Sequence, residues 1–123
     1  IDNDFFKICS ENNITPIIRS IYLQGALLMS KNEILNSKLE WAKNELGIFK
    51  VFCDKNNLDP AGMCLQSVDQ YLDDSIIIIG VNSFDEYSKN LNFFKSRNKH
   101  TMFDEWWNAL PSYGSKLLNP AEW

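Results

Sequence analysis

The sequence predicts an α/β fold that contains a parallel pair of strands. Two segments rich in β-branched residues, Ile14 to Leu23 and Ile76 to Ile79, have the composition of strands. About fifty residues with mainly helical patterns separate them, which is typical of a βαβ unit with a right-handed crossover. The expected order is therefore helix, strand, helices, strand, helix.

The first predicted helix contains Phe5 to Cys9 at helical spacing. Asn12 and Asn13 are expected to end it, because asparagine tolerates a left-handed turn. The opening letters IDNDFFKICSENN resemble the later part of a helix, so we expect the chain to be a fragment of a longer protein. In the strand that follows, Pro16 is expected near the start, where a lost backbone donor costs least, and Gly25 is expected to break it.

The middle of the chain predicts two further helices. Residues 26 to 36 are polar and irregular, and we expect mostly loop with at most a short helical turn. A helical period runs from Lys38 to Asn56, and Asn56 and Asn57 are expected to end that helix. Asp59 and Pro60 form the N-cap and first-turn pair of the next helix. We expect that helix to bury one stripe, formed by Ala61, Cys64, Leu65, Val68, Tyr71 and Leu72.

The second strand and its helix form the most informative segment. Ile76 to Ile79 offers no polar face, which is typical of a parallel strand that is covered on both sides, and Gly80 ends it. Ser83 and Glu86 match the S-x-x-E capping box. An apolar helix face is expected from Phe84, Tyr87, Leu91 and Phe94. The positive end of this helix would lie at the carboxyl edge of the sheet, where α/β proteins bind phosphates.

Composition excludes several function classes. The 123 residues are 45% hydrophobic and 13% aromatic, which suits one packed domain. A net charge of -4 without any Lys/Arg run argues against nucleic acid. Because no apolar run approaches the roughly 20 residues of a membrane span, we expect a cytoplasmic protein with no membrane partner. Three distant cysteines without metal-ligand spacing predict reduced, buried thiols: Cys9, Cys53 and Cys64.

The remaining candidates for chemistry are weak. His100 has no partner at a suggestive spacing and is typical of a solvated histidine, while the adjacent acids Asp104 and Glu105 suit capping or solvent. Aromatic side chains in the tail could stack on a sugar, but buried packing is the more typical role: Trp106, Trp107, Tyr113 and Trp123. For Ser20 and Gln24, the residues favour neither a ligand edge nor ordinary loop hydrogen bonding.

Taken together, IIRSIYLQGALLM at 17–29, the Asp59 to Leu72 helix and IIIIGVNSFDEYSKNL resemble the last quarter of an aldo-keto reductase barrel. In that family the seventh strand ends in a serine before a glycine loop, which matches Ser20 and Gly25. The eighth strand ends in a glycine turn before a helix that holds the adenosine phosphate end of NADP, matching the segment from Gly80 to Asn90. The closing LLNPAEW is similar to a bacterial branch associated with surface-sugar gene clusters.

The resemblance implies the C-terminal portion of a (β/α)8 TIM barrel, with barrel units in residues 1–94 and an aromatic tail packing on them in 95–123. It implies NADP or NAD as cofactor, with Ser20 and Gln24 on the nicotinamide and pyrophosphate side. On the adenosine side it implies Gly80, Val81, Asn82, Ser83, Glu86 and Asn90, the last at the position of an asparagine that contacts adenine.

Three positions depart from the family pattern. Arg19 stands where many members have a tyrosine that stacks on nicotinamide, and Lys89 replaces a common glutamate. Glu86 replaces glutamine or arginine, and its carboxylate would repel a 2′-phosphate. The neutral Asn82 offers no positive charge to offset that repulsion. We therefore expect weak NADP discrimination and tolerance of NAD. A hundredfold preference of the parent enzyme for NADP would contradict this.

The family's Asp, Tyr, Lys and His tetrad lies on earlier strands and matches no segment here. We therefore expect the complete parent protein to transfer hydride from NAD(P)H to an aldehyde or ketone, and this chain to be inactive without it. Two strands would expose sheet edges, so the expected partners are a missing N-terminal barrel half or a second copy. The alternative is a non-catalytic α/β binding or assembly module that uses its aromatic tail.

Overall fold

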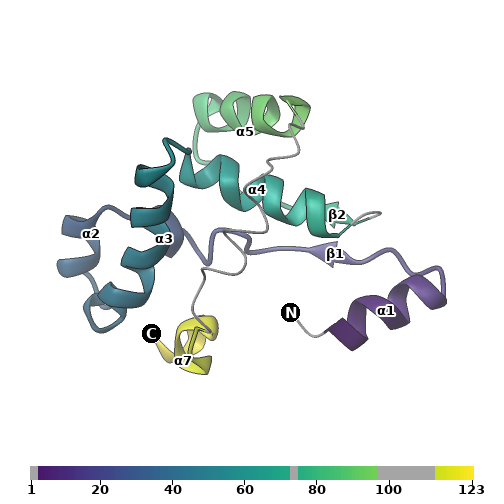
Figure 1. Cartoon of the computed structure of the whole chain (residues 1–123), viewed down its shortest axis with the longest axis horizontal. Coiled ribbons are helices and arrows are strands. Elements are labelled where there is room, and N and C mark those ends of the chain that lie inside the picture. Colours follow the sequence, from purple (N-terminus) through teal and green to yellow (C-terminus); the bar gives the residue numbers. More distant parts are fainter. Residues whose placement is uncertain (1–2, 73–74, 97–112) are drawn as a thin grey trace.

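The fold consists mainly of helices, with one two-stranded parallel sheet among the described residues (Figure 1). A computed structural model describes residues 3–72, 75–96 and 113–123. The parallel α/β pairing predicted from the two hydrophobic segments is confirmed. The elements are α1 (Asn3–Glu11), β1 (Ile17–Ile18), η1 (Ala26–Leu28), α2 (Lys31–Leu35), η2 (Glu40–Ala42), α3 (Lys43–Lys55), α4 (Pro60–Tyr71), β2 (Ile76–Ile77), α5 (Phe84–Ser96), α7 (Ser115–Leu118) and η3 (Pro120–Glu122).

The sheet is smaller and more open than expected. Ile17 pairs with Ile76, and the Ile78 amide donates to the Ile18 carbonyl at 2.8 Å. Ile17, Ile76 and Ile78 are 62%, 53% and 55% exposed. The prediction that both faces of the isoleucine strand are covered is therefore wrong for the described residues. Ile77 and Ile79 are half-buried beside α4 and α5, while the described elements leave the opposite face open.

Two buried clusters give the helical part its core. In the first, residues of η1, α2, η2 and α3 meet α7: Ala26, Ile34, Leu39, Ala42, Leu46 and Leu117. The second joins α3 to α4 through Phe49, Cys53, Met63 and Cys64. All three cysteines are buried free thiols, as predicted. Burial raises the pKa of Cys53 to about 11 and that of Cys64 to about 12, so both stay protonated.

The segment expected to be mostly loop contains η1 and the short helix α2. A full capping box starts α2: the Ser30 amide donates to Glu33 Oε2 at 2.7 Å, and the Glu33 amide donates to Ser30 Oγ at 3.3 Å. Ile34 is buried in the first cluster. The S-x-x-E pattern was present in the sequence, and burial of a single isoleucine stabilises this five-residue helix.

Several predicted helix ends are confirmed. Asn13 and Asn57 adopt left-handed φ values of 52° and 53° just after α1 and α3. Asp59 caps α4 and accepts from the amides of Ala61 at 2.9 Å and Gly62 at 3.1 Å. The buried stripe of α4 differs from the prediction, because Met63 and Ser67 are buried along with Cys64 and Leu65.

The described part of the tail packs onto the helices. Leu117 is almost fully buried, and Tyr113 and Trp123 lie against the first cluster. The indole Nε1 of Trp123 donates to the carbonyls of Lys116 at 3.2 Å and Leu117 at 3.1 Å. The predictions for five residues of the tail lie outside the described residues: His100, Asp104, Glu105, Trp106 and Trp107. Within the described ranges, each helix is too short or too polar to span a bilayer.

Candidate functional site

A polar pocket lies where the two parallel strands end. It has a volume of about 540 Å³ and is formed by the loop after β1, the segment after β2 and the first turns of α5. Because the strands run parallel, their carboxyl ends meet at one edge, which is where ligands bind in α/β sheets. Seven of the eight residues predicted from the sequence line this pocket: Ser20, Gln24, Gly80, Val81, Asn82, Glu86 and Asn90.

The eighth residue, Ser83, caps α5 beside the pocket. Its Oγ accepts from the Glu86 amide at 3.1 Å, while Glu86 Oε2 accepts from the Asn82 amide at 2.7 Å. The serine half of the predicted capping box is thus confirmed. The Glu86 carboxylate accepts from the amide of Asn82, one residue before the N-cap residue Ser83 whose amide a capping box would use. A negative charge already lies at the positive end of α5, where a phosphate would otherwise bind.

The loop after β1 carries an unusual backbone. Ser20, Leu23, Gln24 and Gly25 all have left-handed φ values, of 61°, 49°, 53° and 87°. Hydrogen bonds hold the turn, from the Leu23 amide to the Ser20 carbonyl at 2.8 Å and from the Gly25 amide to the Tyr22 carbonyl at 2.9 Å. Left-handed φ costs a non-glycine residue about 1 to 2 kcal/mol. Such strain is concentrated at ligand-binding loops, and here it sets the backbone direction at Ser20 and Gln24.

Gly80 behaves differently from the expected glycine turn. Its φ is outside the left-handed region, and a methyl group there would meet nothing within 4 Å. The backbone of the described structure therefore does not require glycine at this position. The open space beside Gly80 belongs to the polar pocket.

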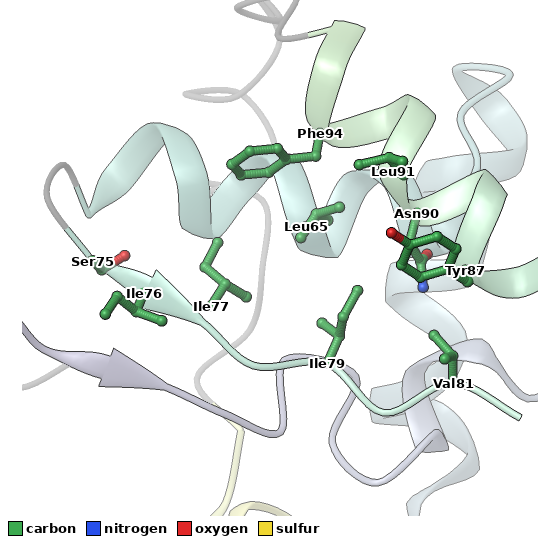
Figure 2. A pocket seen from close by; sticks show the side chains of 10 residues that line it. All are labelled: Leu65, Ser75, Ile76, Ile77, Ile79, Val81, Tyr87, Asn90, Leu91 and Phe94. Carbon is green, nitrogen blue, oxygen red and sulfur yellow. The ribbon is translucent and has the colours of Figure 1, made fainter.

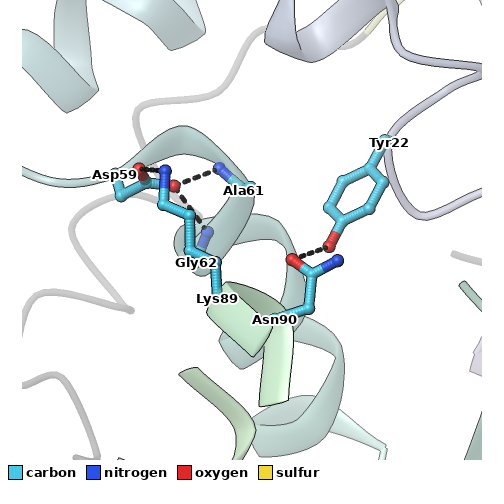
Figure 3. A network of polar contacts seen from close by, with 6 residues as sticks. All are labelled: Tyr22, Asp59, Ala61, Gly62, Lys89 and Asn90. Carbon is cyan, nitrogen blue, oxygen red and sulfur yellow. Dashed lines mark hydrogen bonds and ion pairs between the residues drawn. The ribbon is translucent and has the colours of Figure 1, made fainter. Parts of the chain in front are cut away.

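Tyr22, which the sequence interpretation missed, connects the β1 loop to α5 across the pocket. Its phenolic Oη donates to Asn90 Oδ1 at 3.1 Å (Figure 3). Asn90 is only 7% exposed. Burial raises the pKa of Tyr22 to about 12, with smaller contributions from Cys64, Asp59 and Glu86, so the phenol keeps its proton at neutral pH. Nothing local in the sequence indicates a contact between residues 68 positions apart.

An ion pair holds α5 against α4. Lys89 Nζ lies 2.6 Å from Asp59 Oδ2, while Asp59 Oδ1 caps α4 (Figure 3). Burial acts to raise the pKa of Asp59, but the hydrogen bonds from Lys89, Gly62 and Ala61 outweigh it and lower that pKa overall. Phe93 lies directly over Gly62, where a methyl group would stand 2.8 Å from the ring.

A second, apolar pocket of about 420 Å³ adjoins the first. Figure 2 shows it between the β2 segment and the inner side of α5, with Tyr87, Leu91 and Phe94 pointing toward Ile77 and Ile79. The two pockets share Ile79, Val81 and Asn90. Part of the predicted apolar face of α5 does turn toward the sheet.

The apolar face predicted for this helix is not enclosed by the described residues, however. Phe84 is 78% exposed, and Tyr87 and Phe94 are also exposed. The contacts that bury side chains of α5 lie around Asn90 and Phe93, where the helix meets Tyr22 and α4. Tyr87 and Phe94 therefore border the apolar pocket instead of filling a core.

Comparison with known proteins finds no family model, no curated protein and no solved structure that matches this chain. The aldo-keto reductase resemblance therefore stays a prediction based on the motifs. The candidate site is supported by its own geometry, namely polar side chains from two strand ends gathered in one pocket.

Proposed function

We propose that the polar pocket binds a nicotinamide dinucleotide, and that the chain is the cofactor-binding C-terminal portion of an aldo-keto reductase barrel. The observation that supports this most strongly is the gathering of Ser20, Gln24 and the segment from Gly80 to Asn82 in one pocket. These residues belong to two segments more than fifty positions apart, which the resemblance assigns to opposite ends of one cofactor. Their meeting was not implied by either motif taken separately.

The side chains present suit an extended dinucleotide. Arg19 brings a positive charge to the pocket, and Ser20, Gln24 and Asn82 offer hydrogen-bond donors and acceptors along it. When bound, the cofactor supplies a hydride to an aldehyde or ketone in the complete enzyme. The contribution of this chain is to bind and orient: the β1 loop holds the nicotinamide and pyrophosphate side, and the start of α5 holds the adenosine side.

The cap of α5 favours NAD over NADP. Glu86 Oε2 accepts from the Asn82 amide at 2.7 Å, which places its carboxylate at the start of α5. A 2′-phosphate on this side would meet that negative charge. The single guanidinium that lines the pocket, that of Arg19, lies on the loop after β1 and not on α5. The proposed cofactor is therefore NAD, with NADP binding more weakly.

The open sheet supports the proposal of further barrel strands. Parallel sheets are normally covered on both faces, whereas Ile17, Ile76 and Ile78 are more than half exposed in the described structure. Strands from the N-terminal part of the barrel would cover this face and pair with the free edges. A second copy of the chain would take their place in the isolated polypeptide, and light scattering should then detect an oligomer. A monomer that unfolds cooperatively would contradict this part of the proposal.

Calorimetric titration with NAD and NADP tests the site directly. We expect the chain to bind NAD more tightly than NADP, and the Glu86→Gln variant to lose most of that difference by gaining roughly tenfold affinity for NADP. The matched control is Glu33→Gln, which alters the equivalent capping box of α2 far from the pocket and should leave both affinities unchanged. Absence of binding to both dinucleotides would contradict the proposed function.

The alternative function, binding through the aromatic tail, gains no support from the described residues. Tyr113 packs against the first core cluster, and Trp123 does the same while donating its indole N–H to backbone carbonyls. Side chains used in this way are not free to stack on a sugar. We therefore propose no second function.

A further inference from the structure

We propose that the apolar pocket binds the tail of a small amphiphilic amine, whose protonated head reaches Glu86 at the edge of the polar pocket. The ligand class is an alkylammonium or arylalkylammonium ion. This goes beyond the proposed dinucleotide function, which assigns no ligand to the space between β2 and α5. Three observations support it: the lining of the apolar pocket, its border with the polar pocket, and the sign of the charge at that border.

The apolar pocket has the size and lining of a small-molecule site. Its volume is about 420 Å³, and ligand pockets commonly measure about 300 to 1,000 Å³. None of the ten described residues that line it carries a charge. Tyr87 and Phe94 point into it (Figure 2) and are 50% and 37% exposed. A bound alkyl or aryl group would therefore remove aromatic surface from water.

The apolar pocket shares a border with the polar pocket. Ile79, Val81 and Asn90 line both of them. On α5, Glu86 lies one turn before Asn90 and lines the polar pocket, whereas its neighbour Tyr87 lines the apolar one. Polar and apolar side chains of one helix therefore stand next to each other at the border. A ligand with an apolar tail and a polar head can contact both pockets at once.

Glu86 supplies the charge at this border. Its Oε2 atom accepts from the Asn82 amide at 2.7 Å, and that amide nitrogen is bonded to the carbonyl carbon of Val81. The carboxylate therefore lies beside a residue that lines both pockets. A carboxylate has a second oxygen, so this contact leaves Oε1 able to accept from an ammonium group.

The nearby positive charges are directed elsewhere. Successive side chains of a strand point to opposite faces. Ile17 is 62% exposed on the open face and Ile18 is half-buried, so Arg19 follows on the open face, away from α5. Lys89 of α5 is already paired with Asp59 at 2.6 Å. A head group beside the apolar pocket therefore meets a negative charge, which favours an ammonium ion over a carboxylate.

Calorimetric titration of the full chain with octylamine and octanoate, below their micellar concentrations, tests this proposal. At neutral pH the two probes carry opposite charges on tails of nearly equal length. We expect octylamine to bind about tenfold more tightly than octanoate. Hexylamine should bind about tenfold more weakly than octylamine, because it buries two methylene groups fewer.

Two pairs of variants locate the head and the tail. Glu86→Gln should reduce the preference for octylamine at least threefold. Its matched control is Asp85→Asn, which removes a neighbouring charge of α5 that lines neither pocket and should leave the preference unchanged. Tyr87→Ser removes a ring from the apolar pocket and should weaken both probes about fivefold. Phe84→Ser removes an exposed ring outside both pockets and should weaken neither.

Octylamine that binds no more tightly than octanoate would overturn the proposal. So would a preference that falls equally in Glu86→Gln and Asp85→Asn, or equal weakening by Tyr87→Ser and Phe84→Ser. If Tyr87→Ser fails to fold, the chain-length series and the Glu86 and Asp85 pair still decide the outcome. Because these titrations contain no dinucleotide, their failure is distinct from a failure of the chain to bind NAD.

Discussion

The helical part of the chain and its sheet differ in how completely they are packed. Ala42 and Cys53 are fully buried among the helices, whereas Ile17 and Ile76 in the sheet are more than half exposed. Both regions are rich in apolar residues, so composition does not explain the difference. The helices bury their apolar faces on one another, whereas a two-stranded parallel sheet needs further strands or a second layer to do so. Among the described residues, the helices enclose their apolar side chains, whereas one face of the sheet stays open.

The candidate site lies at the boundary between these two regions. Its walls come from the strand ends. Two contacts hold α5, on its far side, in place: the hydrogen bond from Tyr22 to Asn90 and the ion pair of Lys89 with Asp59. A well-packed helical cluster can therefore hold α5 in place even while the sheet is open. Changes to the helical contacts should reduce stability strongly, and changes on the sheet side should affect it little.

The largest expected effect separates two phenylalanines on helices. Phe49→Ala removes an almost fully buried ring from the second core cluster and should lower the free energy of unfolding by about 3 to 5 kcal/mol. Phe84→Ala removes a ring that is 78% exposed and should change it by less than about 0.5 kcal/mol. Urea unfolding followed by circular dichroism measures both. Similar losses in the two variants would contradict the contrast between core and sheet side.

The next effect compares glycines in two helices. Gly62→Ala forces a methyl group to 2.8 Å from the Phe93 ring and should destabilise the chain by about 1 to 3 kcal/mol through overpacking of α4 against α5. Gly47→Ala in α3 meets nothing within 4 Å and should stabilise by about 0.5 to 1 kcal/mol because alanine favours a helix. If both substitutions stabilise in the same urea experiment, α5 does not pack on α4 as described.

Two tyrosine hydroxyls give a smaller contrast. Tyr22→Phe leaves the Oδ1 atom of the buried Asn90 without its donor and should cost about 1 to 2 kcal/mol. The Tyr113 hydroxyl is buried with no hydrogen-bond partner among the described residues, so Tyr113→Phe should be neutral or mildly stabilising. Thermal unfolding of both variants beside the unmodified chain checks this. Equal destabilisation would show that the Tyr22 hydroxyl contributes no more than that of Tyr113.

The smallest effect depends on pH. The pKa of Asp59 is lowered below its ordinary value of 3.8, so its charged form stabilises the fold above that pH, and the stabilisation is lost as pH falls through the lowered value. Because the pair with Lys89 is partly exposed, it should contribute only about 0.5 to 1 kcal/mol. Asp59→Asn keeps a capping oxygen and should flatten the acid limb of stability below the ordinary pKa of 3.8. An unchanged acid limb would contradict the ion pair.

Features set by neighbouring residues were predictable from the sequence. The Asp59 cap, the left-handed Asn57 after α3 and the parallel pairing of the isoleucine strands all depend on local chemistry or on simple connection rules. The start of α2 was equally local, and its S-x-x-E pattern was overlooked because the helix is so short. Local patterns therefore predicted the long helices and several of their ends, but not the short helix α2.

Features set by distant contacts were not predictable. A run of isoleucines does not reveal which of its faces will be covered, and Ile76 and Ile78 remain exposed because the described helices pack on the other side. The contact between Tyr22 and Asn90 joins two segments that only the tertiary fold brings together. Seven residues chosen from the motif resemblance line one pocket. The resemblance did not indicate that Asn90 Oδ1 would accept a hydrogen bond from Tyr22.

The central claim is that the strand ends and the start of α5 form a dinucleotide site, and amide chemical-shift mapping by NMR tests it most directly. On titration with NAD, we expect the backbone amides of 20–25 and 80–86 to shift together with one dissociation constant. The amides of α2 (Lys31–Leu35), on the far side of the helical cluster, should stay in place. Saturating NAD that shifts neither pocket segment, or that shifts α2 instead, would contradict the account.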